Sequence, residues 1–346
     1  MPDLTTEARP RLLEVRGLSK GFPVGRGGKR RVVQAVDGVD IVIEAGETHG
    51  LVGESGSGKS TTGRLILRLI EPDAGTATFR GVDLFALSGA ALRRIRREIQ
   101  LIYQDPFSSV DPRFRARDLV AEPWVIHRMY DGAERRRRAD ELLRRVGLDP
   151  ASGDRRPALF SGGQLQRIGI ARALALEPAL VICDEPVSAL DVSVQGQIIN
   201  LLIDLQREQG VSYLFIAHDL GVVRHVSHRV SVMYLGRIVE SGTREDVFER
   251  AAHPYTQALL AAMRRGRPEL LAGRIVRGEP PRASDPPSGC AFRTRCPKAQ
   301  ALCAEERPTL VDRGQGHPVA CHFAEVDVAL VRAAAEDARA GPSIPR

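Results

Sequence analysis

The stretch that decides the fold reads Gly53-Glu54-Ser55-Gly56-Ser57-Gly58-Lys59-Ser60-Thr61. An apolar run at Thr48–Val52 precedes it and predicts a strand, and Thr62–Ile70 follows it and predicts a helix. The glycines let the intervening loop curl, so that its N–H groups point inward at an anion beside the positive end of the helix. The order of strand, glycine loop and helix is the context that a polyphosphate-binding loop requires.

The side chains of this loop have predicted roles. Lys59 is expected to reach the β- and γ-phosphates of a nucleoside triphosphate, and Ser60 is expected to ligate Mg²⁺. The chain has 50 Lys and Arg residues, of which only four are Lys, so composition does not account for a lysine here. We therefore predict that all nine residues of the loop contact ATP. Phe22 is either a stacking surface for adenine or a core side chain, and its position does not decide between the two.

Length and composition predict a soluble globular protein with one large domain or two unequal ones. The chain has 346 residues, 43% of them hydrophobic and 27% charged. No apolar run approaches the roughly eighteen residues of a membrane span, and Met1–Gly17 lacks the residue order of a signal peptide. We therefore expect the chain to stay in the cytoplasm.

The net charge of +7 admits nucleic acid, anionic lipid or nucleotide as partners without choosing among them. The densest basic run, Arg135–Arg138, has no interleaved aromatic residues, so we interpret it as a solvated helix face rather than a nucleic-acid patch. Five cysteines in a cytoplasmic chain argue against disulfides and for a metal or core packing.

The rest of the chain alternates predicted strands and helices around this loop. Arg135–Arg138 falls within a helical insert predicted between Phe114 and Ala158, whose clearest helix is Ala133–Val146 with Gly147 as its terminator. Asp105–Arg113, which contains two prolines and two serines, predicts a loop. The other predicted strands and helices are Leu12–Leu18 and Val39–Ile43 on either side of an exposed loop at Gly25–Arg31, then Thr76–Arg80, Ala90–Arg97, Glu98–Tyr103, Tyr213–Ala217, and a hairpin over Arg229–Glu240 that turns at Gly236.

A second apolar strand, Leu180–Cys183, ends in Asp184 and Glu185. A carboxylate at Asp184 is placed to hold the Mg²⁺ that Ser60 also touches. Glu185 is placed to orient or deprotonate an attacking water. An acidic residue at the end of a strand is weak evidence for a nucleotide site when it stands alone. When a phosphate loop precedes it in the same chain, it indicates the second half of an ATP-hydrolysing site.

A third motif, Ser161-Gly162-Gly163-Gln164, opens a predicted helix that runs to about Leu176. With the other motifs it makes the sequence resemble the ATP-binding cassette ATPases over residues 11 to about 250. The motifs that carry this resemblance are the phosphate loop, Gln104 in the Q-loop position, the Ser161–Gln164 signature, Leu180–Glu185 as the Walker B strand, Ser188-Ala189-Leu190-Asp191 as the D-loop and His218 as the switch histidine. Phe160 departs from the leucine that many cassettes have there.

The resemblance implies how the site works. Two subunits pack head to tail, so that each ATP lies between one phosphate loop and the signature of the other subunit. Glu185, His218 and Gln104 are the implied catalytic residues, and Asp191 is the implied D-loop residue. The implied Mg²⁺ ligands are Ser60, Gln104 and Asp184.

Three further stretches resemble the ATPases of oligopeptide and dipeptide importers: Gln104–Ser109, Cys183–Asp191 and His253–Leu260. This resemblance, closest to the second ATPase of a pair, implies two permease subunits, a second ATP-binding subunit and an extracytoplasmic solute-binding protein. The working dimer is expected to be a heterodimer of paralogues, with a homodimer as the alternative, at the cytoplasmic face of the membrane. Nickel and glutathione importers share these features, so the solute stays open.

Two rival classes are a nucleic-acid-related cassette ATPase and a cassette that binds ATP without turnover. The first needs a long coiled coil, a second cassette or inserted zinc modules, and the sequence shows none of these. We therefore expect no nucleic-acid partner. Glu185 and His218 argue against the second class.

The predicted fold class is α/β, a P-loop NTPase core with a helical subdomain and a small cysteine-containing extension. Residues 11–260 are expected to form the nucleotide-binding domain, with the helical subdomain at about 85–178. Residues 261–289 are expected to form a linker rich in Pro, Gly and Arg, and residues 324–346 a tail with a short helix and a frayed end.

Residues 290–323 contain Cys290, Cys296, Cys303 and Cys321 in a segment too small for its own core. Four thiols gathered there are expected to ligate one centre, with Cys183 left over in the core. Cys296-Pro297 is similar to the end of some iron–sulfur runs, and the importers' extension also points to a cluster, so a 4Fe–4S cluster is the first choice. Zinc is the alternative, and unligated or redox-paired cysteines are the third possibility.

Overall fold

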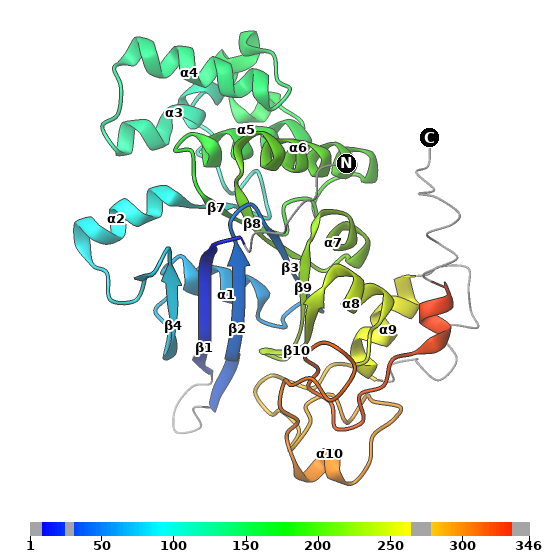
Figure 1. The fold of residues 1–346 in the computed structure, drawn as a ribbon. Coiled ribbons are helices and arrows are strands. Elements are labelled where there is room, and N and C mark those ends of the chain that lie inside the picture. The colour runs from blue at the N-terminus through cyan, green and yellow to red at the C-terminus, as the bar shows by residue number, and fades with distance from the viewer. Residues whose placement is uncertain (1–8, 25–30, 264–277, 334–346) are drawn as a thin grey trace, which may run out of the picture. The chain divides into compact units, whose positions relative to one another are not determined.

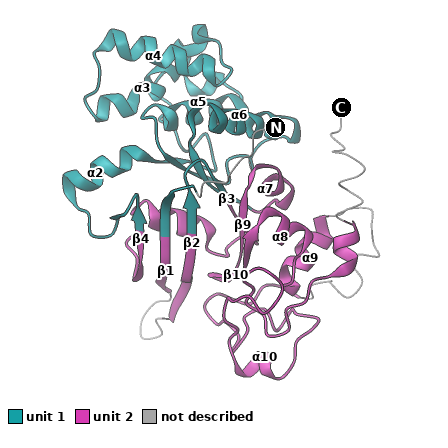
Figure 2. Ribbon diagram, in the orientation of Figure 1, with its two compact units in different colours: residues 1–14, 42–48, 78–217 teal, residues 15–41, 49–77, 218–346 magenta. Residues whose placement is uncertain are grey.

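The computed structural model describes residues 9–24, 31–263 and 278–333 (Figure 1). The predicted loop at Gly25–Arg31 and the end of the tail lie almost entirely outside these residues. Contacts divide the chain into two compact units, which Figure 2 shows in different colours. Unit 1 is Met1–Glu14, Val42–Thr48 and Thr78–Ala217, and unit 2 is Val15–Ile41, His49–Ala77 and His218–Arg346.

Unit 1 contains a parallel sheet of three strands. These are β6 (Ile99–Ile102), β7 (Leu180–Asp184) and β8 (Ser212–Ala217), with β7 in the middle. Every residue of β7 and β8 is buried. Continuous apolar runs of this kind are expected of parallel strands that are covered on both faces, which is why these strands could be predicted.

Helices α5 (Gly162–Leu174) and α6 (Val192–Gln209) pack against each other, and α5 also packs against β6. The sequence analysis predicted α5 but did not predict α6. The buried side chains of α6, Ile198, Ile199, Leu202 and Leu205, recur at helical spacing. That periodicity was a readable signal for this helix.

The predicted helical insert of unit 1 is confirmed. It contains α3 (Ala116–Ile126), α4 (Gly132–Arg145) and two short 3₁₀ turns (Pro150–Asp154 and Pro157–Leu159). Arg117 of α3 joins them, since its guanidinium binds Asp140 at 2.7 Å and Asp154 at 2.5 Å.

The basic run at the start of α4 is a charged helix face. Arg137 and Arg138 each bind Glu134 at 2.7 Å, and Arg136 binds Asp154 at 3.3 Å. The N-cap residue of α4 is Asp131, whose carboxylate accepts a hydrogen bond from the N–H of Glu134. This confirms the interpretation of the run as a solvated face.

Unit 2 contains most of β3 (Thr48–Val52) together with β9 (Arg229–Tyr234) and β10 (Arg237–Thr243). Strand β9 pairs parallel with β3 and antiparallel with β10. The predicted hairpin with a turn at Gly236 is therefore confirmed. The helices described in this unit include α1 (Lys59–Ile66), α7 (Leu220–Val226), α8 (Arg244–Glu249), α9 (Pro254–Met263) and α10 (Leu302–Glu305).

A second sheet has the strand order β2-β1-β4-β5. Its long strands run through both units, as the change of colour along β1 and β2 in Figure 2 shows. Both strands are longer than predicted, and β5 was not predicted. The bounds are β1 Arg11–Val24, β2 Arg31–Glu44, β4 Ala74–Phe79 and β5 Val82–Asp83.

The part of the chain beyond residue 277 that the structure describes belongs to unit 2. It has little regular structure, but Val319 forms bridges with Glu240 of β10 and with Val311. The imidazole of His317 lies 2.7 Å from the carboxylate of Glu240, and both side chains are buried. The segment is therefore fastened to the β9–β10 hairpin by strand pairing and by a buried polar contact.

Candidate functional site

Three glycines of the phosphate loop lie where other residues would be strained. Gly53, Gly56 and Gly58 have positive φ angles of 157°, 76° and 106°. A Cβ atom on Gly53 would lie 2.1 Å from the carbonyl oxygen of Met233, and one on Gly58 would lie 2.1 Å from that of Ala35. Glycine is needed here for both backbone conformation and close approach, in agreement with the sequence prediction.

Helix α1 begins at Lys59 rather than at the predicted Thr62 and ends at Ile66. The prediction was wrong by one turn because the loop and the helix share residues. The N-cap residue is Gly58, which has no side chain to cap the first N–H groups. The hydroxyl of Ser57 is buried and has no hydrogen-bond partner among the described residues. The first N–H groups of α1 and the hydroxyl of Ser57 lie at the positive end of a helix dipole, and both can donate hydrogen bonds to the oxygens of a phosphate.

The ammonium of Lys59 is buried within the loop, with 4% of the residue exposed. It donates to the carbonyl oxygens of Gly53 at 2.8 Å and Glu54 at 2.9 Å. The N–H of Glu54 donates to the phenol oxygen of Tyr255 at 2.9 Å. Burial raises the pKa of Tyr255, which keeps the phenol neutral. The sequence analysis gave Tyr255 no role beyond its place in a family motif.

Glu54 also binds a residue from the cysteine region. The guanidinium of Arg295 lies 2.9 Å and 3.1 Å from its two carboxylate oxygens. Burial disfavours the charge on Arg295, but its hydrogen bonds to Glu54 and Tyr234 outweigh burial and raise its pKa. No motif pointed to this contact, which joins positions 241 residues apart.

Strand β7 places Asp184 and Glu185 at its carboxyl end. Asp184 is 4% exposed. Glu185 adopts a φ of 48°, in the left-handed region that glutamate rarely visits, and its N–H donates to the carbonyl of Ile216 in β8 at 2.9 Å. Strained residues of this kind are held by their surroundings and are typical of functional sites.

The side-chain nitrogen of Gln104 donates to the carboxylate of Glu185 at 3.0 Å. Gln104 follows β6 by two residues and Glu185 follows β7 by one, and the two strands are parallel neighbours. The structure therefore brings together two of the three predicted catalytic residues. The Mg²⁺ contact predicted for Gln104 stays a prediction.

The signature begins α5 with a complete capping box. The hydroxyl of Ser161 accepts from the N–H of Gln164, and the Gln164 side chain accepts from the N–H of Ser161. A Cβ atom on Gly163 would lie 2.4 Å from Val194, so this glycine allows α5 and α6 to pack closely. Ser161 is exposed and Phe160 is buried. The helix thus presents its N-terminus to solvent, as a site for an external anion requires.

The remaining predicted residues occupy several elements. Phe22 in β1 is partly buried, with the ammonium of Lys20 5.8 Å from its ring centroid, which does not decide between its two predicted roles. Asp191 is the N-cap residue of α6, and His218 is exposed after β8. The predicted site residues in unit 2 are Phe22, the loop Gly53–Thr61 and His218, and Ser60 and Thr61 of this loop lie in the first turn of α1. Those in unit 1 are Gln104, the signature, Asp184, Glu185 and Asp191.

None of the five cysteines forms a disulfide in the structure. The four outside β7 line one small pocket, which is also bordered by His253 and Phe292. Burial raises the pKa of Cys290, Cys321 and Cys296, the last to about 11. Within the described ranges, however, no group of three or more His, Cys, Asp or Glu side chains is arranged to hold a metal ion. The structure gathers the thiols but does not support the predicted iron–sulfur cluster.

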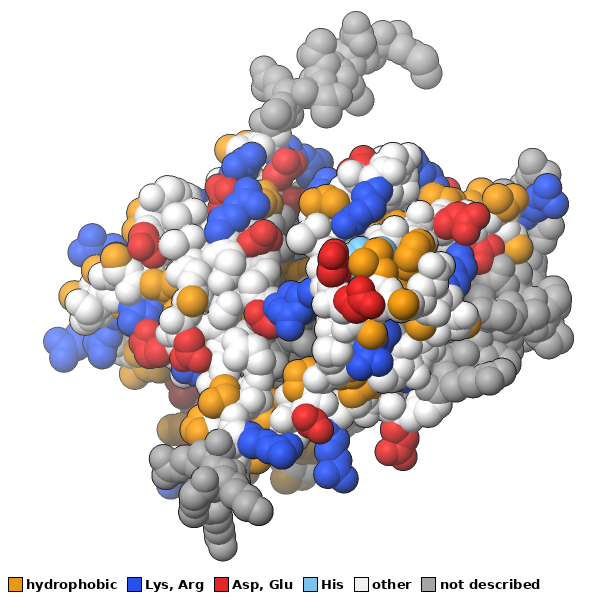
Figure 3. Space-filling model, turned by 90° about the horizontal axis from the view of Figure 1, so that it is seen from below, with side chains coloured by type: hydrophobic (Ala, Val, Ile, Leu, Met, Phe, Trp, Pro, Cys, Tyr) orange, Lys and Arg blue, Asp and Glu red, His pale blue; other side chains and the backbone are white. Residues whose placement is uncertain are grey.

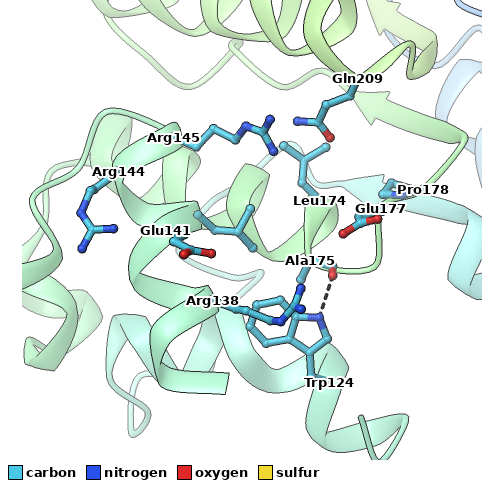
Figure 4. Close-up of a pocket in the computed structure, with 11 residues that line it drawn as sticks. Trp124, Arg138, Glu141, Arg144, Arg145, Leu174, Ala175, Glu177, Pro178 and Gln209 are labelled. Carbon is cyan, nitrogen blue, oxygen red and sulfur yellow. Dashed lines mark hydrogen bonds between the residues drawn. The ribbon is translucent and has the colours of Figure 1, made fainter. Parts of the chain in front are cut away.

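A cavity of about 890 Å³ in unit 1 contains none of the predicted site residues (Figure 4). Arg138, Arg145 and Glu141 lie on its walls, and the indole nitrogen of Trp124 donates to the carbonyl of Ala175 at 2.7 Å.

On the face shown in Figure 3, basic and acidic side chains are interspersed rather than gathered by sign. Such mixing is typical of a solvated surface.

A glycine-bounded phosphate loop, a buried strand that ends in Asp-Glu and a serine-capped Gly-Gly helix together define an ATPase of the cassette class. Comparison with known proteins identifies the family. Residues 36–188 match the model described as ABC transporter, and residues 239–303 match the one described as oligopeptide/dipeptide transporter, C-terminal region. The second match includes Cys290, Cys296 and Cys303 but not Cys321.

Curated relatives match nearly the whole chain. It is 49% identical over 327 residues to the oligopeptide transport ATP-binding protein AppF of Bacillus subtilis (strain 168), which covers 92% of this chain and 99% of the relative. It is 50% identical over 316 residues to the putative oligopeptide transport ATP-binding protein YkfD of the same organism, covering 90% and 95%. The chain therefore belongs to the ABC transporter family of ATP-binding subunits, with the oligopeptide/dipeptide type of C-terminal region.

Solved structures support the same conclusion for the cassette. A dimeric structure of the ATP-binding cassette MJ0796 in a post-hydrolysis state, bound to ADP and Pi, has a TM-score of 0.61 and 30% identity, and covers 67% of this chain and 99% of that one. The structure of cbiO1 from Clostridium perfringens has a TM-score of 0.60 and 27% identity, covering 69% and 90%. The predicted fold class of the cassette and the assignment as an ABC-type ATPase are confirmed.

Proposed function

We propose that this chain hydrolyses ATP to drive import of di- or oligopeptides through a membrane permease. The observation that carries the proposal is the order of two matches in one chain, an ATPase cassette followed by the C-terminal region of oligopeptide and dipeptide transporters. The relatives AppF and YkfD carry oligopeptide transport in their names. Nickel or glutathione as solute remains the alternative.

The proposed steps of hydrolysis are assigned to two groups of residues, those that bind the phosphates and those that act on the attacking water and the γ-phosphate. The N–H groups of the phosphate loop and Lys59 bind the phosphate oxygens, as the positive-φ glycines allow. Glu185 orients the attacking water and accepts its proton, and Gln104 holds the Glu185 carboxylate in place. His218 donates a hydrogen bond to the γ-phosphate.

Ser60 and Asp184 would hold Mg²⁺, with Gln104 as a further ligand. A hydroxyl and a carboxylate are oxygen donors of the kind that Mg²⁺ prefers, which is the fit that the donor set provides. When bound, the ion neutralises charge on the phosphate oxygens.

A second ATP-binding subunit supplies the other side of the site. The signature of that subunit would meet the γ-phosphate bound to this chain, and Ser161, Gly162 and Gly163 of this chain would meet the one bound to that subunit. An exposed helix N-terminus with Ser161 as its N-cap residue supports this role, because the positive end of the helix dipole favours an anion. The MJ0796 cassette was solved as a dimer. A paralogous heterodimer is the first choice and a homodimer the alternative.

The permease docks on the segment Asp105–Arg113, which is neither helix nor strand. Phe107 is 57% exposed and flanking Phe114 is 47% exposed, so apolar surface is available to a short helix of a partner. None of the helices described here is both long and apolar enough to cross a membrane. The subunit would act peripherally at the cytoplasmic face, with an extracytoplasmic solute-binding protein delivering peptide to two permease subunits.

The domain division also belongs to this proposal: a cassette at 11–260, a linker at 261–289, the cysteine region at 290–323 and a tail at 324–346. The proposal of a shared centre in the cysteine region rests on the sequence and on four thiols that line one pocket, although the described side chains are not arranged to hold a metal ion. A 4Fe–4S cluster is proposed first and zinc second. Anaerobically purified protein with broad absorption at roughly 400 nm would support iron, while colourless protein with one zinc per chain would support zinc.

Transport by the assembled importer tests the proposal. The chain is purified with the permease and partner ATPase encoded beside it, placed in vesicles, and assayed for ATP hydrolysis with solute-binding proteins loaded with peptide, nickel or glutathione. Stimulation by the peptide-loaded protein alone is expected. Stimulation only by the nickel- or glutathione-loaded protein would move the assignment to that solute.

A further inference from the structure

The contact between Arg295 and Glu54 reaches from the cysteine region into the phosphate loop. One terminal nitrogen of Arg295 lies 2.9 Å and 3.1 Å from the two oxygens of Glu54. The side chains are 9% and 28% exposed. A pair this buried differs from surface ion pairs, which water and salt weaken, because removal of either partner leaves a desolvated charge.

Glu54 lies at the point where the loop holds its lysine. Its carbonyl oxygen accepts from the ammonium of Lys59 at 2.9 Å, and its N–H donates to Tyr255 at 2.9 Å. Arg295 therefore binds the side chain of a residue whose two backbone groups are also fixed. A displacement of Glu54 would move a partner of Lys59.

Aromatic packing holds Arg295 in this position. Its guanidinium lies 5.9 Å from the centroid of the Tyr234 ring, and a terminal nitrogen lies 3.4 Å from the Tyr234 hydroxyl. Phe292, which is 1% exposed, packs at 5.3 Å against both Tyr234 and Tyr255. The N–H of Arg295 donates to the carbonyl of Phe292 at 3.0 Å. The short turn from Phe292 to Arg295 therefore places an aromatic side chain and a guanidinium beside the phosphate loop.

We infer that Arg295 is a positioning residue for the phosphate loop, and that by holding Glu54 it sets the affinity of the cassette for ATP. Its guanidinium binds the side chain of Glu54, itself a predicted ATP contact, and it acts on the rest of the loop through that residue. The inference rests on the proposed function only in that this loop binds ATP. It gives the cysteine region a role in nucleotide binding that is separate from any metal it holds.

The test compares ATP affinity in four single variants and one double variant of the full chain, measured with a fluorescent trinitrophenyl analogue of ATP. Arg295→Ala is expected to raise Kd about tenfold, which corresponds to about 1.4 kcal/mol. Arg295→Lys is expected to recover part of the loss, since it keeps a charge but not the planar group. Arg293→Ala is the matched control, because Arg293 lies in the same turn and, among the described residues, its side chain hydrogen-bonds Ser288 and not the phosphate loop. Its Kd is expected to stay within twofold of wild type.

The decisive comparison measures the effect of Arg295→Ala in a protein that already carries Glu54→Gln. If Arg295 acts through Glu54, adding Arg295→Ala to Glu54→Gln changes Kd by less than twofold. Thermal melting of each variant shows that it is folded. A Kd within twofold of wild type for Arg295→Ala, or a tenfold effect that persists in the Glu54→Gln background, would overturn the inference.

The Kd comparison and the assay of the assembled importer together separate this inference from the proposed transport role. A protein that shows the Arg295 effect but is stimulated by no loaded solute-binding protein would keep the inference and lose the proposed import function. A protein that drives peptide uptake with an unchanged Kd for Arg295→Ala would do the reverse.

Discussion

Gln104 donates a hydrogen bond of 3.0 Å from its side-chain nitrogen to the carboxylate of Glu185. The glutamine directly precedes the segment Asp105–Arg113 that is proposed to meet the permease, and the glutamate is the proposed base of hydrolysis. A movement of that loop would therefore change the orientation of the base. In the proposed function, this contact would connect the docking of a membrane partner to the rate of hydrolysis.

Gln104→Ala is expected to lower kcat for ATP about tenfold and to change KM little. A hydrogen bond to a charged group contributes about 1.5–3 kcal/mol, and here it acts on the orientation of Glu185 rather than on the bound phosphates. Steady-state phosphate release measures both constants. Gln100→Ala is the control, since Gln100 of β6 binds the backbone carbonyl of Arg96. Equal losses in the two variants would contradict the role given to Gln104.

Lys59→Ala is expected to weaken ATP binding about hundredfold, because the phosphates lose a buried cation and its charge-assisted hydrogen bonds. Isothermal titration with the MgATP complex measures Kd. The control is Arg80→Ala, which removes one positive charge from an exposed ion pair with Glu98. Unchanged affinity in Lys59→Ala would remove this lysine from the site.

Ser161→Ala is expected to reduce ATP hydrolysis at least tenfold while the Kd of the isolated subunit for ATP stays within twofold. In the proposed dimer the hydroxyl would contact the ATP of the opposing subunit, so binding to a single subunit is not expected to depend on it. Thr243→Ala is a closely matched control, because Thr243 forms the same capping box at the start of α8. Each variant loses about 1 kcal/mol of capping energy. Loss of hydrolysis in both would show a general effect of destabilisation.

His317→Ala is expected to loosen the attachment of the cysteine region to β10. It removes the imidazole partner of the fully buried Glu240 carboxylate, which keeps hydrogen bonds from the N–H groups of Ala252 and His253. Loss of a hydrogen bond to a charged group costs about 1.5–3 kcal/mol. Hydrogen exchange of Arg237–Thr243 should accelerate at least about tenfold. Because the single Trp124 lies in unit 1, its fluorescence is expected to change little. Unchanged exchange in β10 would show that His317 does not fasten the segment.

The parts of the fold that repeat a local pattern could be predicted from the sequence. The strand Thr48–Val52 and the helix over Ala90–Arg97 are found within a residue of their expected bounds. The glycine loop and the capped signature helix carry their chemistry in consecutive residues, so a single sequence was sufficient to identify them. Helix α6 was missed although its apolar residues recur at helical spacing.

Contacts between distant parts of the chain could not be predicted. The pairs Arg295–Glu54 and His317–Glu240 each join two elements through ordinary charged side chains, whose types occur throughout the sequence. Nothing in their spacing marks them, since their proximity arises from the packing of the cysteine region on the β9–β10 hairpin. The gathering of four thiols was predictable from composition, but the arrangement of their sulfur atoms was not.

ATP hydrolysis by Glu185→Gln is the most direct test of the central claim that this chain is a hydrolysing cassette whose base is Glu185. The substitution keeps the shape of the side chain and removes its ability to accept a proton. The account predicts that Kd for ATP stays within threefold, that phosphate release at saturating MgATP falls at least about hundredfold, and that a closed dimer accumulates in size-exclusion chromatography. Phosphate release at the wild-type rate would contradict it.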